Sequence, residues 1–169
     1  MRVLLSIGAI GLVAWVAVAA AAAPSSTRVV PCSDIILGAR TGHDGGYRVV
    51  LGAVSVPPAY RPQVVPTGLQ RWRFSSKVGL VIRAGRGVVS VSVPRVWRKR
   101  AAITWGNSTG IVSSLRIARC SVREPGKPWN AYAGGFYLRS RAACVPLVFS
   151  IGQQRTTVRF GVGRRCGGA

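Results

Sequence analysis

The side chains that most often do catalytic chemistry are scarce in this chain of 169 residues. It has one histidine and three carboxylates, and His43 and Asp44 stand side by side in a glycine-rich turn. A hydrolase built on His43 would need a distant serine, and no G-x-S-x-G segment marks a nucleophile of that kind. A glycosidase would need two carboxylates at a set separation, which Asp34, Asp44 and Glu124 could supply only through folding. We therefore expect a non-enzymatic protein, with a hydrolase centred on His43 as the weakest alternative.

The four cysteines are better candidates for disulfides than for a metal site. Cys32, Cys120, Cys144 and Cys166 lack the C-x-x-C spacing that is typical of zinc sites. The chain also has no H-E-x-x-H, acidic calcium loop or P-loop, so we expect no metal and no cofactor. An even number of cysteines in an exported chain predicts two disulfides, for which three pairings are possible. We favour Cys32–Cys166, which would join the first strand to the last, and Cys120–Cys144, which would close the loop that carries Trp129.

The first 22 residues predict export. A basic start is followed by a long uncharged apolar run that ends in small alanines. This order is typical of a secretory signal peptide, with cleavage at one of residues 20–22. The alternative is an uncleaved anchor, because an apolar run of about 20 residues can span a bilayer. In both cases we expect a tether at residues 23–31 and one domain at residues 32–166, secreted or at the cell envelope.

The rest of the chain alternates between apolar and polar residues with a period of two, which indicates strands. Residues 145–151 and 158–162 flank a short polar connection and predict a β-hairpin near the end of the chain. A second hairpin is predicted between residues 78–84 and 88–93, which a Gly-Arg-Gly turn joins. Residues 47–56 are apolar almost throughout and predict one strand that is buried on both faces.

These strands predict the fold class. Turn residues separate short strands about every ten residues, and no segment after the apolar start shows a sustained helical spacing. Ala101, Ile103 and Trp105 share one parity and are expected to point into the core. We predict an all-β fold, a single disulfide-stapled β-sandwich of about eight to ten strands, either jelly-roll or immunoglobulin-like.

The charge of the chain suggests its partners. The formal net charge is +21, and most of the 24 basic residues are arginines. A charge of this size raises the affinity for any polyanion, which outside the cell means an anionic cell-wall polymer, a glycan or an acidic lipid surface. Specific nucleic-acid binding is not expected, because no helix-turn-helix, zinc-finger or RNP-like motif accompanies the charge. The alternative is compositional, since a GC-rich genome favours arginine on any solvated surface.

The densest basic segment is Arg95, Trp97, Arg98, Lys99 and Arg100 with one intervening valine. A tryptophan among four cations could stack on a sugar or sit at a lipid headgroup layer. The alternative is a loop between two strands in which Trp97 covers the edge of the core. The sequence leaves both interpretations open.

Further arginines alternate with apolar partners in the predicted strands, and side chains of one parity share a sheet face. We therefore expect the following six to point outward: Arg71, Arg73, Arg83, Arg116, Arg139 and Arg159. If they shared one sheet, they would form a flat basic face that binds polyanions with a steep salt dependence. Scattered over several sheets, they would give only weak, unspecific attraction.

The second half of the chain carries a series of short motifs. Residues 101–166 contain I-T-W-G-N, S-S-L-R-I-A-R-C, W-x-x-Y-x-G-G-F-Y-L-R, C-V-P-L and V-R-F-G-V-G-R-R-C. In these motifs the chain resembles a set of exported actinobacterial β-rich proteins of unknown function. The resemblance implies a disulfide-bonded, exported β-rich domain, and it implies no activity, ligand or functional residue.

We expect the protein to be an extracellular or cell-envelope domain with a structural or adhesive role. The alternative is a binding module that holds an acidic polymer or glycan through a basic arginine face. A flat, featureless surface would favour the structural role. A groove with an aromatic wall would favour the binding module.

Overall fold

The computed structural model describes residues 27–167, and its regular structure consists of strands. Within this range there is no α-helix, and the only helical turns are η1 (Cys32–Asp34), η2 (Asp44–Gly46) and η3 (Arg95–Trp97). The expectation of an all-β fold is therefore confirmed. The predicted signal peptide, residues 1–22, lies outside the described residues.

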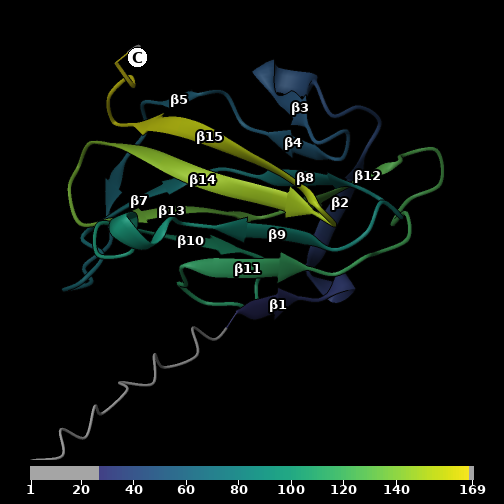
Figure 1. The fold of residues 1–169 in the computed structure, drawn as a ribbon, viewed down its shortest axis with the longest axis horizontal. Helices are drawn as coiled ribbons and strands as arrows, with labels where there is room; N and C mark the ends of the chain where they lie inside the picture. The colour runs from purple at the N-terminus through teal and green to yellow at the C-terminus, as the bar shows by residue number, and fades with distance from the viewer. Residues whose placement is uncertain (1–26, 168–169) are drawn as a thin grey trace, which may run out of the picture.

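One sheet has six strands and lies toward the viewer in Figure 1. Its spatial order is β1 (Arg28–Val30), β11 (Ser114–Ile117), β9 (Val89–Ser92), β14 (Ala143–Ile151), β15 (Gln154–Val162) and β5 (Tyr60–Arg61). β14 and β15 form the predicted C-terminal hairpin, in which Val145 pairs with Phe160. β1 lies parallel to β11, and Val30 is fully buried. The domain therefore includes Arg28 onward, which corrects the boundary of the predicted tether.

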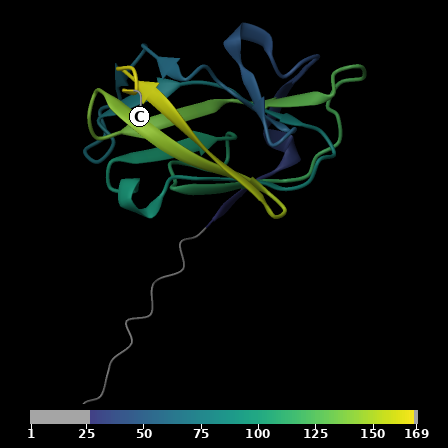
Figure 2. The ribbon, with the colours of Figure 1, turned by 45° about the horizontal axis from the view of Figure 1, so that its top comes forward.

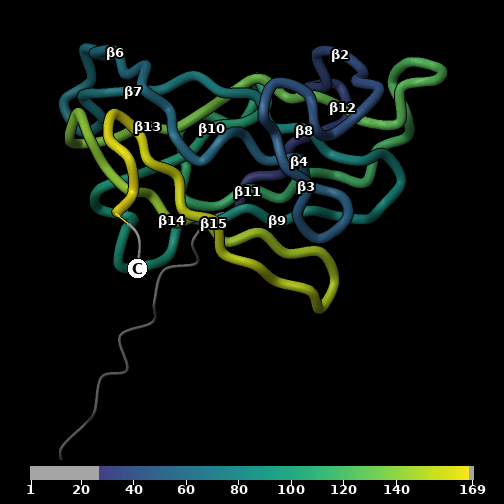
Figure 3. The backbone as a smooth tube through the Cα atoms, turned by 90° about the horizontal axis from the view of Figure 1, so that it is seen from above, coloured from purple at the N-terminus to yellow at the C-terminus, as the bar shows by residue number. Residues whose placement is uncertain are grey.

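Two smaller sheets form the layer behind the first. The four-stranded sheet has the order β10 (Ala101–Trp105), β13 (Gly134–Leu138), β7 (Phe74–Lys77) and β6 (Val65–Pro66). The five-stranded sheet has the order β2 (Ile35–Ala39), β12 (Trp129–Tyr132), β8 (Leu80–Arg83), β4 (Val54–Val56) and β3 (Arg48–Val50). Seen from above, β6, β7 and β13 lie apart from β14, β15 and β9 (Figure 3).

The two smaller sheets are halves of one bent layer. Only Ala133 separates β12 from β13, and only Val78 and Gly79 separate β7 from β8, which pair with those strands. At this break the N–H of Val78 donates a hydrogen bond to the carbonyl of Gly134 at 2.8 Å. The indole N–H of Trp105 donates to the carbonyl of Val78 at 3.0 Å. The layer therefore bends while the polar backbone groups of Val78 stay paired.

The core fills the space between the six-stranded sheet and the bent layer. Phe136 of β13 packs against Phe160 of β15 with ring centroids 5.4 Å apart, and against Trp105 of β10 at 5.9 Å. Ala101, Ile103 and Trp105 all point inward, as predicted, and are almost fully buried. Figure 2 shows the long β14–β15 hairpin crossing in front of the layer that supplies these partners.

Two predicted strand connections are wrong. Residues 47–56 form a hairpin of β3 and β4, not one buried strand, and its turn has Leu51 and Gly52 at φ angles of 51° and 62°. The turn at residues 85–87 closes no hairpin, because β8 belongs to the five-stranded sheet and β9 to the six-stranded sheet. It carries the chain from one layer to the other. Such breaks divide residues 27–167 into 15 strands, where about eight to ten were expected.

All four cysteines form disulfides, but the predicted pairing is wrong. Cys32 is bonded to Cys120 with Cα atoms 5.6 Å apart, and Cys144 to Cys166 with Cα atoms 5.2 Å apart. β1 pairs with β11 rather than with the last strand. Cys32 follows β1 and Cys120 follows β11, so this pairing brings the two cysteines together. Cys144 lies opposite Gly161 of β15, so the chain end folds back onto its own hairpin.

The two disulfides indicate an oxidising compartment outside the cytoplasm. Among residues 27–167, no helix is long and apolar enough to cross a membrane. The extracytoplasmic location that the sequence predicts is therefore supported by the covalent structure of the domain itself.

Candidate polyanion-binding surface

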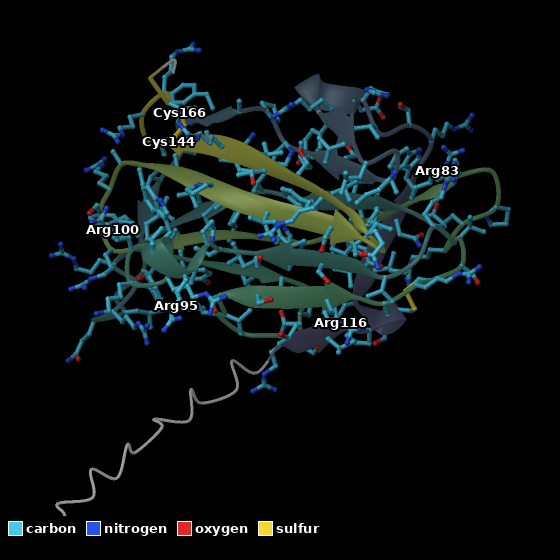
Figure 4. The ribbon with its side chains drawn as sticks, in the orientation of Figure 1. Arg83, Arg95, Arg100, Arg116, Cys144 and Cys166 are labelled. Carbon is cyan, nitrogen blue, oxygen red and sulfur yellow. A yellow bond between two sulfur atoms is a disulfide. The ribbon has the colours of Figure 1, made fainter. Side chains whose placement is uncertain are left out.

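The six arginines that the alternation places outward are all exposed, as predicted. They do not share one sheet. Arg83 lies on β8 of the five-stranded sheet, whereas Arg116 and Arg159 lie on the six-stranded sheet. The other three, Arg71, Arg73 and Arg139, flank strands of the four-stranded sheet. Figure 4 shows Arg83 and Arg116 far from Arg95 and Arg100, which lie at the opposite end of the molecule.

At that opposite end, the register of the four-stranded sheet aligns three arginines. Ala101 of β10 pairs with Leu138 of β13, and Leu138 pairs with Phe74 of β7. One step beyond these pairs stand Arg100, Arg139 and Arg73, which we call the arginine row. The N–H of Arg139 donates to the carbonyl of Arg100 at 3.1 Å, and Nε of Arg73 donates to the carbonyl of Arg139 at 3.4 Å. The row thus crosses three adjacent strands.

The dense basic segment before β10 lies beside this row. Trp97 is half-buried and packs against the core, which confirms the interpretation that it covers the core edge. The guanidinium of Arg100 lies over its ring at 5.7 Å, and Nε of Arg98 donates to the carbonyl of Val93 at 3.2 Å. These contacts hold the segment in a fixed turn. We call the whole surface the basic end, made up of Arg71, Arg73, Arg95, Arg98, Lys99, Arg100 and Arg139.

The three carboxylates of the chain all flank the five-stranded sheet. Asp34 precedes β2, where it is buried and accepts hydrogen bonds from Ser108 N–H at 3.2 Å and from Ser108 Oγ at 2.7 Å. Asp44 is exposed in η2, just before β3. Glu124 accepts a hydrogen bond from Gly38 N–H of β2 at 2.7 Å and pairs with Lys127. Asp34 also reaches the turn after β10, to which Ser108 belongs. No described carboxylate forms a hydrogen bond or salt bridge at the other end of the four-stranded sheet, where the arginine row lies.

These bonds also shift titrations in the five-stranded half. The hydrogen bond from Gly38 N–H, followed by the one from Lys127, lowers the pKa of Glu124. Burial, with the charge of Asp34 as a second cause, raises the pKa of Tyr132 on β12 to about 12. The hydroxyl of Tyr132 lies 3.6 Å from Sγ of Cys120. The carboxylates of this half therefore serve the fold.

Cations at the basic end have no comparable partner. Among residues 27–167, the ion pair of Lys127 with Glu124 is the only salt bridge. Like charges held on neighbouring strands add their potentials over the surface instead of cancelling. At physiological salt the Debye length is about 8 Å, so charges that lie this close still act together. The positive potentials of the basic end therefore reinforce one another.

His43 is not assembled into a catalytic group with other described residues. Its side chain is exposed, and its backbone N–H donates to Oγ1 of Thr41 at 3.1 Å. The buried Ser55 lies close to this turn, and its hydroxyl donates to the carbonyl of Gly42, the residue before His43, at 2.5 Å. Within the described part of the chain, no three His, Cys, Asp or Glu side chains form a group that could hold a metal ion.

The four-stranded sheet also carries a groove that was not predicted from the sequence. A groove of about 320 Å³ lies next to the break of the bent layer, and Ser75, Lys77 and Tyr137 are among the residues that line it. The alternation of β13 contained the signal: Phe136 and Leu138 are fully buried, so Tyr137 between them faces outward. Arg139 has the same parity, so the groove and the arginine row lie on one face.

Comparison with known protein families, with curated proteins and with solved structures finds no match for this chain.

Proposed function

We propose that this protein is an exported, non-enzymatic domain of the cell envelope that attaches to an anionic polymer through its basic end. The observation that carries the proposal is the arginine row, which spans three adjacent strands and forms no salt bridge with a described residue. The predicted signal peptide and the two disulfides support a place outside the cytoplasm. We also infer that the two layers form a β-sandwich, whose rigid face would present the row.

The spacing of the row suits a repeating anion. Neighbouring strands lie about 4.8 Å apart, so the three backbone positions span about 10 Å. Guanidinium groups bind phosphate and carboxylate oxygens in a two-pronged geometry that lysine cannot copy. Arg73 and Arg100 are partly fixed by their contacts with the Arg139 carbonyl and the Trp97 ring. Such pre-ordering reduces the entropy that binding would cost.

The protein would therefore adhere to the envelope by binding this polymer. The anionic partner would be a polymer of the envelope, because export separates the protein from most nucleic acid. An enzymatic role has little support, since His43 stands exposed and the buried carboxylate of Asp34 is engaged by Ser108. The remaining basic residues would add a general attraction that brings the polymer toward the row.

The test compares two triple variants that remove the same charge. One is R73A/R100A/R139A, which deletes the row, and the other is R83A/R116A/R159A, which deletes three exposed arginines of the other two sheets. The affinity for long-chain inorganic polyphosphate would be measured over a series of salt concentrations. We expect the row variant to lower the slope of log K against log salt by roughly 2 to 3, because each lost contact removes slightly less than one released counterion.

The control variant should change this slope much less, because its arginines lie apart from one another. Equal slopes for the two variants would mean that total charge, and not the row, determines binding. That result would overturn the proposal. Circular dichroism of both variants would verify that each retains the fold.

A further inference from the structure

The break in the bent layer opens a groove on its outer face. At the break the strands approach so closely that a Cβ on Gly134 would overlap the carbonyl oxygen of Thr104. A Cβ on Gly135 would likewise overlap the carbonyl oxygen of Ser76. Both positions must therefore be glycine, and the floor of the groove carries no side chains there. The resulting hollow of about 320 Å³ is at the small end of the range for ligand sites.

Polar side chains surround this bare floor. Ser75 and Lys77 project outward from β7, because Ser76 between them is buried. Thr104 projects outward from β10 between the fully buried Ile103 and Trp105. Tyr137 forms an aromatic wall, and Asn107 stands in the turn that follows β10. Four kinds of hydrogen-bonding group thus line one small hollow.

None of these polar groups is used by the fold. Within residues 27–167, the side chains of Ser75, Lys77, Thr104, Asn107 and Tyr137 make no hydrogen bond to one another or to any other described group. The nearby carboxylate of Asp34 lies behind Gly106 and is engaged by Ser108. Lys77 forms no salt bridge with a described residue.

We propose that this groove binds one carboxylated pyranose ring of an acidic glycan. The aromatic face of Tyr137 would pack against the apolar face of the sugar ring. The hydroxyls of Ser75 and Thr104 and the amide of Asn107 can both donate to and accept from sugar hydroxyls. Lys77 would then pair with the carboxylate of the ring. A bare phosphate chain would use none of the aromatic or hydroxyl groups.

This inference rests on the proposed function, because the groove continues the arginine row on the same sheet. Tyr137 of β13 lies two residues before Arg139, and Lys77 of β7 lies four residues after Arg73. Four residues of extended strand span about 13 Å. An extended acidic glycan could thus place one sugar in the groove while its next anions reach the row. The groove would supply selectivity for sugars, and the row would supply general affinity.

The test uses two tetrasaccharides of equal length. One is a hyaluronan fragment, which alternates glucuronate with N-acetylglucosamine, and the other is neutral chitotetraose. We expect the wild-type protein to bind the acidic fragment at least tenfold more tightly. Lys77→Ala should reduce this preference several-fold, whereas the matched variant Arg86→Ala, which removes an exposed cation outside both the groove and the basic end, should change it less than twofold. Tyr137→Leu keeps the side-chain bulk and should weaken both sugars about tenfold.

Polyphosphate provides the second readout. Tyr137→Leu removes no charge, so its affinity for polyphosphate should stay within twofold of the wild type. Sugar binding that is absent, or insensitive to both groove variants, would overturn this inference even if polyphosphate still depends on the arginine row. An equal loss of polyphosphate and sugar binding in Tyr137→Leu would overturn it too. Conversely, sugar binding that needs Tyr137 while the row variant matches its control would overturn only the proposed function.

Discussion

Two pairs of consecutive strands, β7–β8 and β12–β13, connect the two halves of the bent layer. The halves differ in whether their charged side chains have partners within the protein. In the five-stranded half, Asp34 accepts hydrogen bonds from Ser108, and Glu124 accepts one from Gly38 and pairs with Lys127. These carboxylates thus bond to other groups of the protein. In the four-stranded half, the arginine row and the groove present cations and hydroxyls that the described fold leaves without ionic partners.

This contrast indicates how one surface of a very basic protein can differ from the rest. A net charge of +21 by itself predicts attraction to every polyanion. The chain has only three carboxylates, and their positions decide which surface stays uncompensated. All three flank the five-stranded half. Asp34 also reaches the four-stranded half, but it does so at the turn after β10, at the end of that strand opposite the arginine row. Placement of a few acids can therefore mark a binding surface more clearly than the placement of many bases.

The largest expected effect comes from removing the disulfides, which close loops of different length. Cys32–Cys120 joins the start of the five-stranded half to the six-stranded sheet across 88 residues, and Cys144–Cys166 closes 22 residues within the C-terminal hairpin region. In the chain-entropy model these loops are worth about 4.6 and 3.4 kcal/mol. We expect the alanine pair at Cys32 and Cys120 to lose more stability in urea unfolding than the alanine pair at Cys144 and Cys166.

The matched measurement is the free energy of unfolding of each double variant under the same non-oxidising conditions. A larger loss for Cys144 and Cys166 would contradict the ranking. It would show that the C-terminal hairpin, rather than the five-stranded half, depends most on a covalent link.

A smaller effect is expected at the break between the halves. Trp105→Phe keeps an aromatic ring against Phe136 but leaves the carbonyl of Val78 without its indole donor. A buried carbonyl that loses its partner costs about 1 to 3 kcal/mol, and the smaller ring adds to that loss. We expect thermal unfolding to show a total loss of about 3 kcal/mol. Trp129→Phe is the matched control, because the buried indole of Trp129 has no hydrogen-bond partner among the described residues.

If the two variants lose the same stability, the hydrogen bond to Val78 contributes nothing measurable. The break would then be held by packing alone. A difference of 1 kcal/mol or more in the expected direction, which is about fivefold in the folding equilibrium, would assign that share to the hydrogen bond.

Local alternation predicted much of this molecule. The inward set at Ala101, Ile103 and Trp105 and the outward arginines follow from parity, which depends only on neighbours within one strand. The C-terminal hairpin was equally predictable, because its two runs lie close together in the sequence. The all-β class follows from the same pattern. Each of these features is decided within a few residues.

The candidate site depends on information that alternation does not contain. The arginine row unites positions 73, 100 and 139, and only the register between distant strands aligns them. The groove depends on a break at Val78 and Gly79 that coincides with Ala133 on the partner strand. The disulfide pairing failed for the same reason, since strand order decides which cysteines meet. Long-range pairing, not composition, separates a scattered set of arginines from a surface.

The smallest expected effect concerns the hydrogen bond and the ion pair of Glu124 in the five-stranded half. The hydrogen bond from Gly38 N–H, and then Lys127, lowers the pKa of Glu124 from its ordinary value of 4.5. The folded protein therefore binds fewer protons at this group than the unfolded chain does. Its contribution to stability is present above the unfolded pKa and is lost as the pH falls through the folded pKa. Because the side chain is partly exposed, solvent and salt screen the contribution, so we expect it to be small.

Urea unfolding across the acid range, with wild type and Glu124→Gln compared at low and high salt, measures this contribution. The wild type should lose its advantage over Glu124→Gln as the pH falls below about 4.5, and added salt should narrow that advantage at neutral pH. Asp44→Asn is the matched control, an exposed carboxylate of the same half whose side chain bonds to no described residue. If Asp44→Asn shows the same pH dependence as Glu124→Gln, the acids of this half act through net charge. A dependence confined to Glu124 would mean that the hydrogen bond to β2 is what distinguishes an engaged acid from a solvated one.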